Sequence, residues 1–261
     1  MIVSSFYRSF FFASLCTLLH LCGYMQLPFF YIEEYDPSQK EIILNEDTSK
    51  HVIQVLRMKE GERLNLTDGK GNLIEAEIAE AQKKHCSVKV NHSKLITHNS
   101  YRTIIAISLL KNTSRFEWFL EKATEIGVSE IIPLICDRTE KQKFRYDRMK
   151  GICISAMLQS QQTWLPALNE PKQFGDLEIW KCNNGTNLIA HCIDEGKQAL
   201  SNLQITKSSN RLIAIGPEGD FTKDEIEIAL QNSFIPVSLG ETRLRTETAG
   251  IVAATILTVM N

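Results

Sequence analysis

The hydrophobic pattern of the chain changes in character near Thr103. Before this residue, short apolar runs are separated by turn residues, and after it apolar runs alternate with stretches of helical spacing. The first pattern is typical of strands and turns, and the second of strands that alternate with helices. The sequence therefore predicts a small β domain at residues 25–97 and an α/β domain at residues 98–261.

The first domain is expected to be a small β-barrel. The Asp68-Gly69 pair supplies the turn chemistry of a hairpin. A short helix at about residues 47–57 interrupts the strands, because its apolar residues have helical spacing. The polar, unpatterned residues 93–102 are interpreted as the linker. The expected strands are residues 29–33, 41–44, 63–67, 73–79 and 86–90.

The second domain is expected to contain five β-then-α units, which predict a mainly parallel sheet with helices on both faces. Ser114 with Glu117, and Thr222 with Glu225, have the spacing of capping boxes at helix N-termini. Gly127 is expected to end the first of these helices. The expected strands are residues 103–110, 130–136, 187–192, 211–215 and 236–239, and further helices are expected at 147–161 and 246–260.

Composition and charge limit the function. The chain has 261 residues, of which 43% are hydrophobic and 23% charged, as is ordinary for a globular protein. The formal net charge is −2, so nucleic-acid binding would need a local basic patch. None of the seven cysteines forms a Cys-x-x-Cys pair, so we expect reduced thiols and no metal site.

The first 24 residues resemble a poor signal peptide, with Arg8 as the only positive charge and no cleavage site. They are too short and too polar for a membrane span. We interpret residues 1–24 as an extension that precedes the true start at Met25, the alternative being a signal-like segment. The rest of the chain has no targeting signal, so we expect a cytoplasmic protein.

Two glycine-containing loops follow predicted strands, at the position where parallel sheets bind ligands. Residues 216–219 allow close backbone approach to a flat ligand, or form only a tight connection. Residues 239–249 contain a glycine turn, then Arg243 and Arg245, before a helix that begins at Thr246; a solvated helix start is the alternative. Neither a Walker A nor a Gly-x-Gly-x-x-Gly pattern occurs, which argues against an ordinary nucleotide site.

Two further features have both a functional and a structural interpretation. His191, at the end of a predicted strand, is a candidate base or site wall, or a structural histidine. Residues 138–150 carry six Lys or Arg side chains against one Glu and one Asp, with Phe144 and Tyr146 between them. Basic and stacking groups together suit a looped RNA, and a solvated face is the alternative.

Taken in order, these segments resemble the SPOUT methyltransferases and, within them, the RsmE family. The resemblance lies in Gly-Pro-Glu-Gly at residues 216–219, Leu-Gly at 239–240 and Leu-Arg-x-Glu-Thr-Ala at 244–249. It extends to Lys-Ala-Thr-Glu-Ile-Gly-Val at 122–128 and to His-Val-Ile-Gln-Val-Leu-Arg-Met at 51–58. It covers residues 25–261, and several ordered motifs are far more specific than any one alone.

The resemblance implies a trefoil-knot methyltransferase domain preceded by a PUA-like RNA-binding barrel, in a homodimer. It implies S-adenosylmethionine-dependent methylation of N3 of a uridine in 16S ribosomal RNA, free or in the small ribosomal subunit. Arg245 is expected to stabilise the anionic base, and the proton acceptor is Glu247, Glu218 or no side chain at all. For Glu247, stabilisation of the helix start is an equal alternative. The expected cofactor-binding residues are Ala190, Gly216, Gly219, Leu239, Gly240 and Leu244, and the expected RNA-binding residues are Arg57, Lys141, Lys143 and Arg145.

The chain departs from the family pattern in one helix. The family has Glu-Gln-x-x-Arg near residue 158, where this chain has Leu-Gln-Ser-Gln-Gln at residues 158–162. We therefore assign no catalysis to this helix. Two alternative functions stay open: methylation of a ribose 2′-OH on another RNA, and a catalytically silent RNA-binding protein on the same fold.

Overall fold

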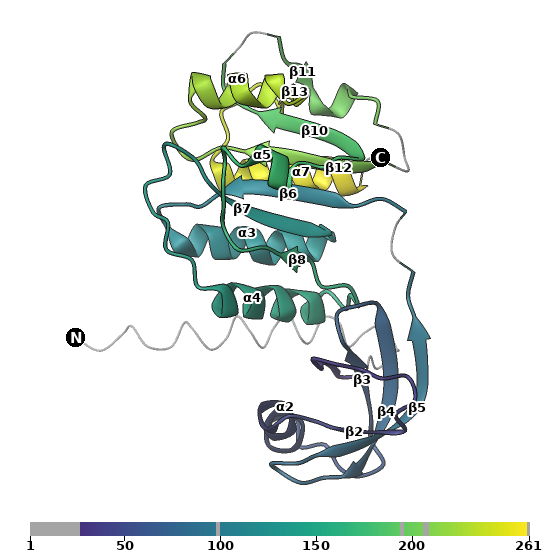
Figure 1. The fold of residues 1–261 in the computed structure, drawn as a ribbon. Helices are drawn as coiled ribbons and strands as arrows, with labels where there is room; N and C mark the ends of the chain where they lie inside the picture. The colour runs from purple at the N-terminus through teal and green to yellow at the C-terminus, as the bar shows by residue number, and fades with distance from the viewer. Residues whose placement is uncertain (1–26, 98–99, 194–195, 206–208, 260–261) are drawn as a thin grey trace, which may run out of the picture.

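The computed structural model describes residues 27–97, 100–193, 196–205 and 209–259, and the predicted extension 1–24 lies outside them. The described chain has two parts, a smaller part built around a curled sheet and a larger α/β part (Figure 1). They correspond to the β and α/β patterns of the sequence.

The smaller part is a five-stranded sheet with two short helical turns between its second and third strands. Its elements are β1 (Phe29–Tyr31), β2 (Glu41–Ile43), α2 (Glu46–Lys50), the π-helical η2 (His51–Val55), β3 (Arg63–Thr67), β4 (Asn72–Glu80) and β5 (Ser87–Leu95). The strand order is β1-β3-β4-β5-β2. All pairs are antiparallel except β1 with β3. The expected barrel is therefore a curled half-barrel.

Alternating side chains explain this sheet. Along β3 and the middle of β4 every second residue is apolar and at most 2% exposed, and these residues pack in one core. The residues concerned are Leu64, Leu66, Ile74, Ala76 and Ile78.

The predicted linker begins too early. Residues 93–95 continue β5, and Leu95 pairs with Asn72 at the far end of β4. These residues are polar enough to lack a hydrophobic pattern, but their backbone completes the ladder with β4. A strand that is held only by backbone hydrogen bonds to its neighbour shows no alternation of apolar and polar side chains from which it could be predicted.

The larger part contains an eight-stranded sheet whose pairings are all parallel. Its strands are β6 (Thr103–Ser108), β7 (Glu130–Ile135), β8 (Ala167–Leu168), β9 (Lys172–Gln173), β10 (Gly185–Ala190), β11 (Gln198–Ala199), β12 (Asn210–Ile215) and β13 (Ile235–Ser238). Their order is β11-β13-β10-β12-β6-β7-β8, with β9 also paired to β7. The predicted parallel sheet is confirmed, and the knot implied by the resemblance stays a prediction.

Helices cover both faces of this sheet (Figure 1). One face carries α3 (Thr113–Ile126), α4 (Tyr146–Gln159), the 3₁₀ turn η3 (Leu200–Asn202) and α7 (Thr246–Val259), and the other carries α5 (Leu177–Trp180) and α6 (Lys223–Gln231). In β6, Ile105 and Ile107 pack with the first group, whereas Ile104 and Ala106 pack with the second. Because both faces are buried, the strand is apolar throughout.

Helix starts test the two predicted capping boxes. Thr222 and Glu225 form the predicted box at the start of α6. The predicted box of Ser114 and Glu117 is wrong, because Asn112 caps α3 and its side chain accepts a hydrogen bond from the Ser114 N–H. Asparagine is as good an N-cap as serine, so the earlier residue takes the role.

Helix α7 packs closely on α3 and on the central strand. A Cβ at Gly250 would lie 2.6 Å from Cε2 of Phe119 and 2.9 Å from Cδ1 of Ile107, so only glycine fits at this position. Glu247 is the only charged residue of α7. Such a helix must be covered over most of its surface, which makes it the central helix of this face.

The two parts are connected by the segment that follows α4, residues 160–165, which we call the joint. The Gly71 N–H donates to the Thr163 carbonyl at 2.9 Å. The indole N–H of Trp164 donates to the carbonyl of Ile96 at 3.0 Å. The joint therefore extends the hydrogen bonding of the smaller sheet into the larger part.

Candidate functional site

Three loops enclose a cavity of about 540 Å³ at the carboxyl ends of β10, β12 and β13. Because β10 lies beside both β12 and β13, these three strand ends meet at one edge of the sheet. We call the three loops, residues 190–192, 215–220 and 237–246, the rim. The cavity is bordered by residues 190–192, 215–218 and 237–246, with Lys197, Asp220 and Ala249.

The rim brings together most of the residues predicted to bind a cofactor. The predicted residues that border the cavity are Ala190, Gly216, Leu239, Gly240 and Leu244. Gly219 does not border it, and its carbonyl instead accepts a hydrogen bond of 2.6 Å from Arg138. The neighbouring Glu218 and Asp220 border the cavity in its place.

The backbone of the rim favours glycine at two positions. A Cβ at Gly216 would lie 3.1 Å from the backbone nitrogen of Phe221, so the turn after β12 is closed tightly. Gly240 has a φ of +145°, which side chains rarely adopt, and the space around it is open. Both positions leave backbone groups accessible at the cavity, as recognition of a flat ligand requires.

The two predicted catalytic residues lie in different places. Arg245 borders the cavity and is exposed. Glu247 does not border the cavity; it is 7% exposed, and its Oε1 lies 3.7 Å from Nε of Arg115 on α3. Its Oε2 is buried and has no hydrogen-bond partner among the described residues. The structure thus places an arginine, and not this glutamate, at the cavity.

Two carboxylates of the rim accept backbone hydrogen bonds from other loops, and nothing in the sequence predicts these bonds. Asp220 has a φ of +65°, and its Oδ2 accepts a hydrogen bond of 2.9 Å from the Cys192 N–H. Glu218 Oε1 accepts one of 3.1 Å from the Lys111 N–H in the loop after β6. The only sequence signal was their position within and after the glycine loop.

His191 borders the cavity, but it is also largely buried in the protein. It is 9% exposed, and its Nδ1 is buried without a hydrogen-bond partner in the described part of the chain. Burial and the nearby Lys197 lower the pKa of His191, and Asp220 opposes them. The imidazole is therefore neutral at pH 7 and forms part of the cavity wall.

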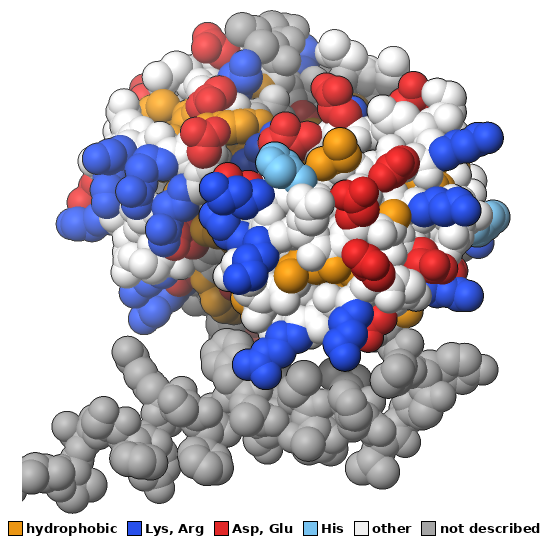
Figure 2. All heavy atoms as spheres, turned by 90° about the horizontal axis from the view of Figure 1, so that it is seen from below, with side chains coloured by type: hydrophobic (Ala, Val, Ile, Leu, Met, Phe, Trp, Pro, Cys, Tyr) orange, Lys and Arg blue, Asp and Glu red, His pale blue; other side chains and the backbone are white. Residues whose placement is uncertain are grey.

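The predicted RNA-binding residues lie in two places. Lys141, Lys143 and Arg145 are exposed on the segment between β7 and α4, whereas Arg57 is exposed on the smaller part with a φ of +57°. Seen from below, Lys and Arg side chains gather on one flank of the molecule, and both signs of charge mix elsewhere (Figure 2). A local concentration of this kind is what a chain of slight negative charge needs to bind RNA.

The two aromatic residues of this segment are committed to packing. The ring of Phe144 meets that of Phe116 edge to face, with centroids 6.2 Å apart. The Tyr146 hydroxyl donates to the Leu168 carbonyl at 3.2 Å. The aromatic rings of the segment therefore stabilise the start of α4, while Lys143 and Arg145 are exposed beside them.

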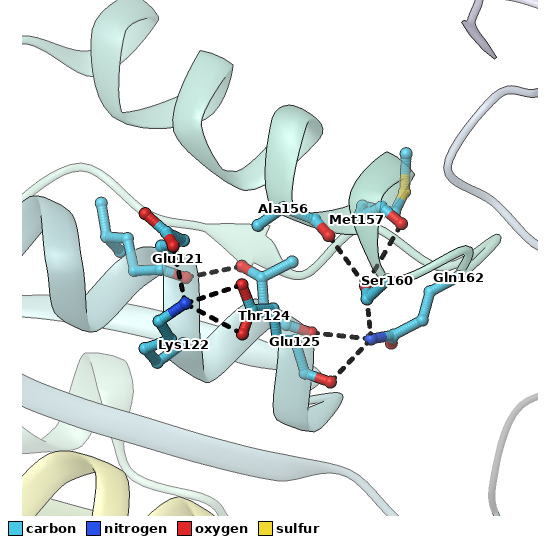
Figure 3. A network of polar contacts seen from close by, with 9 residues as sticks. Glu121, Lys122, Thr124, Glu125, Ala156, Met157, Ser160 and Gln162 are labelled. Carbon is cyan, nitrogen blue, oxygen red and sulfur yellow. Dashed lines mark hydrogen bonds and ion pairs between the residues drawn. The ribbon is translucent and has the colours of Figure 1, made fainter. Parts of the chain in front are cut away.

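The stretch that departs from the family pattern closes the end of α3 (Figure 3). The Gln162 amide donates to the carbonyls of Thr124 and Glu125, at 3.0 and 2.9 Å, and to Ser160 Oγ at 3.0 Å. Gly127, in the left-handed conformation, ends the helix as predicted. Since β7 begins directly after it, this end of α3 lies opposite the cavity, and the stretch has a structural role.

The described residues contain neither a metal-binding cluster nor a membrane-spanning helix. No group of three His, Cys, Asp or Glu side chains in the described ranges could hold a metal ion. None of the described helices has the length and apolarity needed to cross a bilayer.

Both parts of the chain match known domain families. Residues 97–258 match the RNA methyltransferase domain, and residues 44–91 match the RNA methyltransferase PUA domain. The first match covers the whole parallel sheet and its helices up to residue 258, and the second covers most of the smaller sheet.

Similar proteins match over nearly the full chain. The ribosomal RNA small subunit methyltransferase E of Buchnera aphidicola is 28% identical, over 90% of this chain and 94% of that protein. A probable rRNA-methyltransferase from Porphyromonas gingivalis is 38% identical with a TM-score of 0.81, over 88% and 97%. The corresponding enzyme E from Neisseria gonorrhoeae, bound to S-adenosyl methionine, is 26% identical with a TM-score of 0.81, over 90% and 98%.

Proposed function

The chain belongs to the RsmE family, the ribosomal RNA small subunit methyltransferases E, and on this premise we propose that it methylates N3 of one uridine in 16S ribosomal RNA with S-adenosylmethionine. The observation that carries the proposal is the rim, where glycine loops surround a cavity at the carboxyl ends of three parallel strands. The similar structure that contains S-adenosyl methionine supports the choice of cofactor.

The residues of the rim fit this cofactor. The cavity of about 540 Å³ is within the range of small-molecule sites. Ala190, Leu239 and Leu244 supply apolar walls for the adenine, and Gly216 and Gly240 supply backbone groups that can approach it. Gly219 contributes indirectly, through the shape of its turn. When bound, S-adenosylmethionine supplies a methyl group on a sulfonium whose leaving group is neutral.

The residues at the cavity must make N3 of uracil a nucleophile. The neutral imide nitrogen has no available lone pair, so its proton must leave before or during attack on the methyl carbon. Arg245 borders the cavity, and in this proposal it stabilises the negative charge that then spreads over the uracil carbonyls. Holding N3 and the methyl carbon at about 3–3.5 Å would supply the remaining rate acceleration through proximity and orientation.

Of the two candidate proton acceptors, Glu218 is the better placed. It borders the cavity, while Glu247 does not. Glu247 is buried against Arg115 at the first turn of α7. Within this proposal Glu247 therefore orders the start of the helix that follows Arg245, and Glu218 accepts the proton directly or through water.

The RNA is proposed to lie across the basic segment. Lys141, Lys143 and Arg145 are exposed between β7 and α4, and Arg57 offers a second contact from the PUA-like part. Phosphate contacts from such side chains position an RNA without reading its sequence. We also propose that the reaction takes place in the cytoplasm, where the small ribosomal subunit is found.

A homodimer is proposed from the exposed part of α7 and its neighbour α3. Helix α7 has no charged residue after Glu247, yet Ile251, Val252 and Ile256 are only half-buried. On α3, Trp118 is 43% exposed. A second copy would cover these apolar side chains. Sedimentation equilibrium tests this: a monomer at micromolar concentration would contradict it.

Mass spectrometry of 16S ribosomal RNA from a strain that lacks the gene tests the activity and its target together. We expect one N3-methyluridine to be missing, and the wild-type gene to restore it. Retention of this nucleoside with loss of a ribose methyl group would favour the 2′-O alternative. Calorimetry with S-adenosylmethionine separates both from a silent RNA-binding protein, which would show no binding.

A further inference from the structure

Arg138 belongs to the basic segment by sequence, but its guanidinium is bonded to the rim. Its Nη1 donates to the Gly219 carbonyl at 2.6 Å and lies 3.4 Å from the Phe221 carbonyl. A Cβ at Gly219 would lie 3.2 Å from Cδ of Arg138, so the side chain also packs against this glycine. Hydrogen bonds from a charged donor at such distances are among the stronger ones in proteins.

The residue after Gly219 is held by a second loop. Asp220 adopts a left-handed conformation, with a φ of +65°, and its carboxylate accepts from the Cys192 N–H at 2.9 Å. A non-glycine residue keeps such a conformation only when its surroundings hold it there. The Gly219-Asp220 turn is thus hydrogen-bonded to the loop that follows β7 and to the loop that follows β10.

The loop that carries Arg138 is itself firmly anchored. The Asp137 N–H donates to Glu225 Oε1 at 2.9 Å, and Thr222 Oγ1 donates to Asp137 Oδ2 at 3.3 Å. Thr139 is buried, and its hydroxyl accepts from the Cys136 N–H at 2.8 Å. Arg138 therefore projects from a fixed backbone, which suits it to hold another loop in place.

We propose that Arg138 is a positioning residue for the cofactor cavity and is not part of the RNA-contacting surface. It acts through the Gly219-Asp220 turn, because Glu218 and Asp220 border the cavity on either side of the carbonyl that it binds. Without the bond, the turn would occupy other conformations for part of the time. The apparent cofactor affinity would then fall in proportion to the fraction of molecules that keep the binding-competent turn. The inference rests on the proposed function, since it takes S-adenosylmethionine as the ligand of the cavity.

The test compares Arg138→Met with Lys143→Met, two exposed cations of the same segment, in the full-length chain. Calorimetry should show that Arg138→Met weakens S-adenosylmethionine binding roughly tenfold, the effect of one lost charge-assisted bond. KM for S-adenosylmethionine should rise while kcat at saturation changes little. Arg138→Lys, which keeps a donor, should recover part of the affinity.

RNA binding provides the opposite readout. Lys143→Met should leave cofactor affinity unchanged but lower the slope of log Kd for 16S RNA against log salt concentration by about one, as loss of a phosphate contact does. Arg138→Met should leave this slope unchanged. The inference on Arg138 would be overturned if Arg138→Met bound the cofactor as tightly as wild type. It would also be overturned if Arg138→Met lowered the salt slope as much as Lys143→Met does. Neither result would affect the proposed function. A wild-type chain that binds no S-adenosylmethionine would overturn the proposed function as well.

Discussion

The rim and the joint each depend on a glycine with a positive φ, Gly240 within the rim and Gly71 where the smaller sheet binds the joint, yet they differ in what surrounds that glycine. Gly240 of the rim has nothing within 4 Å of the position of a Cβ. Gly71, which binds the joint, would place its Cβ inside the Trp164 indole. The joint is closed by its own side chains, and the rim is left open. Changes in the joint should therefore alter stability, and changes in the rim should alter binding and rate.

The largest expected effect is on rate and lies in the rim. Arg245→Met removes one of the cations that border the cavity, Lys197 and Arg243 being others, while keeping much of its apolar stem. Loss of one group that stabilises developing negative charge lowers kcat about 100-fold or more. Transfer of a radioactive methyl group to small ribosomal subunits measures this. The free energy of unfolding should stay within about 0.5 kcal/mol of wild type, as for other exposed positions. Unchanged kcat would remove Arg245 from the mechanism.

The next effect is on stability and lies at the joint. Gly71→Ala places a methyl group against Trp164 and the Ile96 carbonyl at a φ of +95°. The clash and the strained backbone together should lower the free energy of unfolding by about 2–3 kcal/mol in urea titrations.

Gly240→Ala is the matched control in the rim, because its φ is also positive but its Cβ meets nothing. It should cost only about 1 kcal/mol of stability, from the strained backbone alone, and weaken S-adenosylmethionine binding. If the two variants lost equal stability and equal affinity, the contrast between rim and joint would be wrong.

A smaller loss is expected for Gln162→Leu in the joint. Its amide satisfies the carbonyls of Thr124 and Glu125 at the end of α3 (Figure 3). Removing these bonds should lower the free energy of unfolding by about 1 kcal/mol. Methyl transfer per folded molecule should be unchanged, since this end of the sheet is opposite the cavity. Loss of activity without loss of stability would instead give this stretch the catalytic role that we do not assign to it.

The two regions also differ in how far the sequence predicts them. Residues 216 and 240 could be selected because glycine after an apolar strand has a local cause. The Asp220–Cys192 and Arg138–Gly219 bonds could not, because their partners lie 28 and 81 residues apart. They form only once β7, β10 and β12 are set in one sheet.

The same reason explains the errors made at element ends. Residues 93–95 join a strand through the backbone of β4, and α3 is capped by Asn112 although Ser114 and Glu117 have the capping-box spacing. Local chemistry offered two acceptable caps, and the path of the chain after β6 decided between them. The predictable features are those whose cause lies within a few residues.

The smallest expected effect is the pH dependence contributed by His191 in the rim. Its folded-state pKa is lowered, first by burial and then by Lys197, against the opposing charge of Asp220. As pH falls through the unfolded-state value of about 6.5, the unfolded chain binds the proton first, so stability is lost on acidification and is fully present above that pH. His191→Gln removes this contribution and leaves the other histidines in place. The difference in free energy of unfolding between wild type and His191→Gln, measured from pH 8 to pH 5, should therefore move against the wild type at the acidic end. If the free energies of unfolding of the two proteins changed in parallel over the whole pH range, the His191 imidazole would be open to solvent. The cavity wall would then not be closed at this residue.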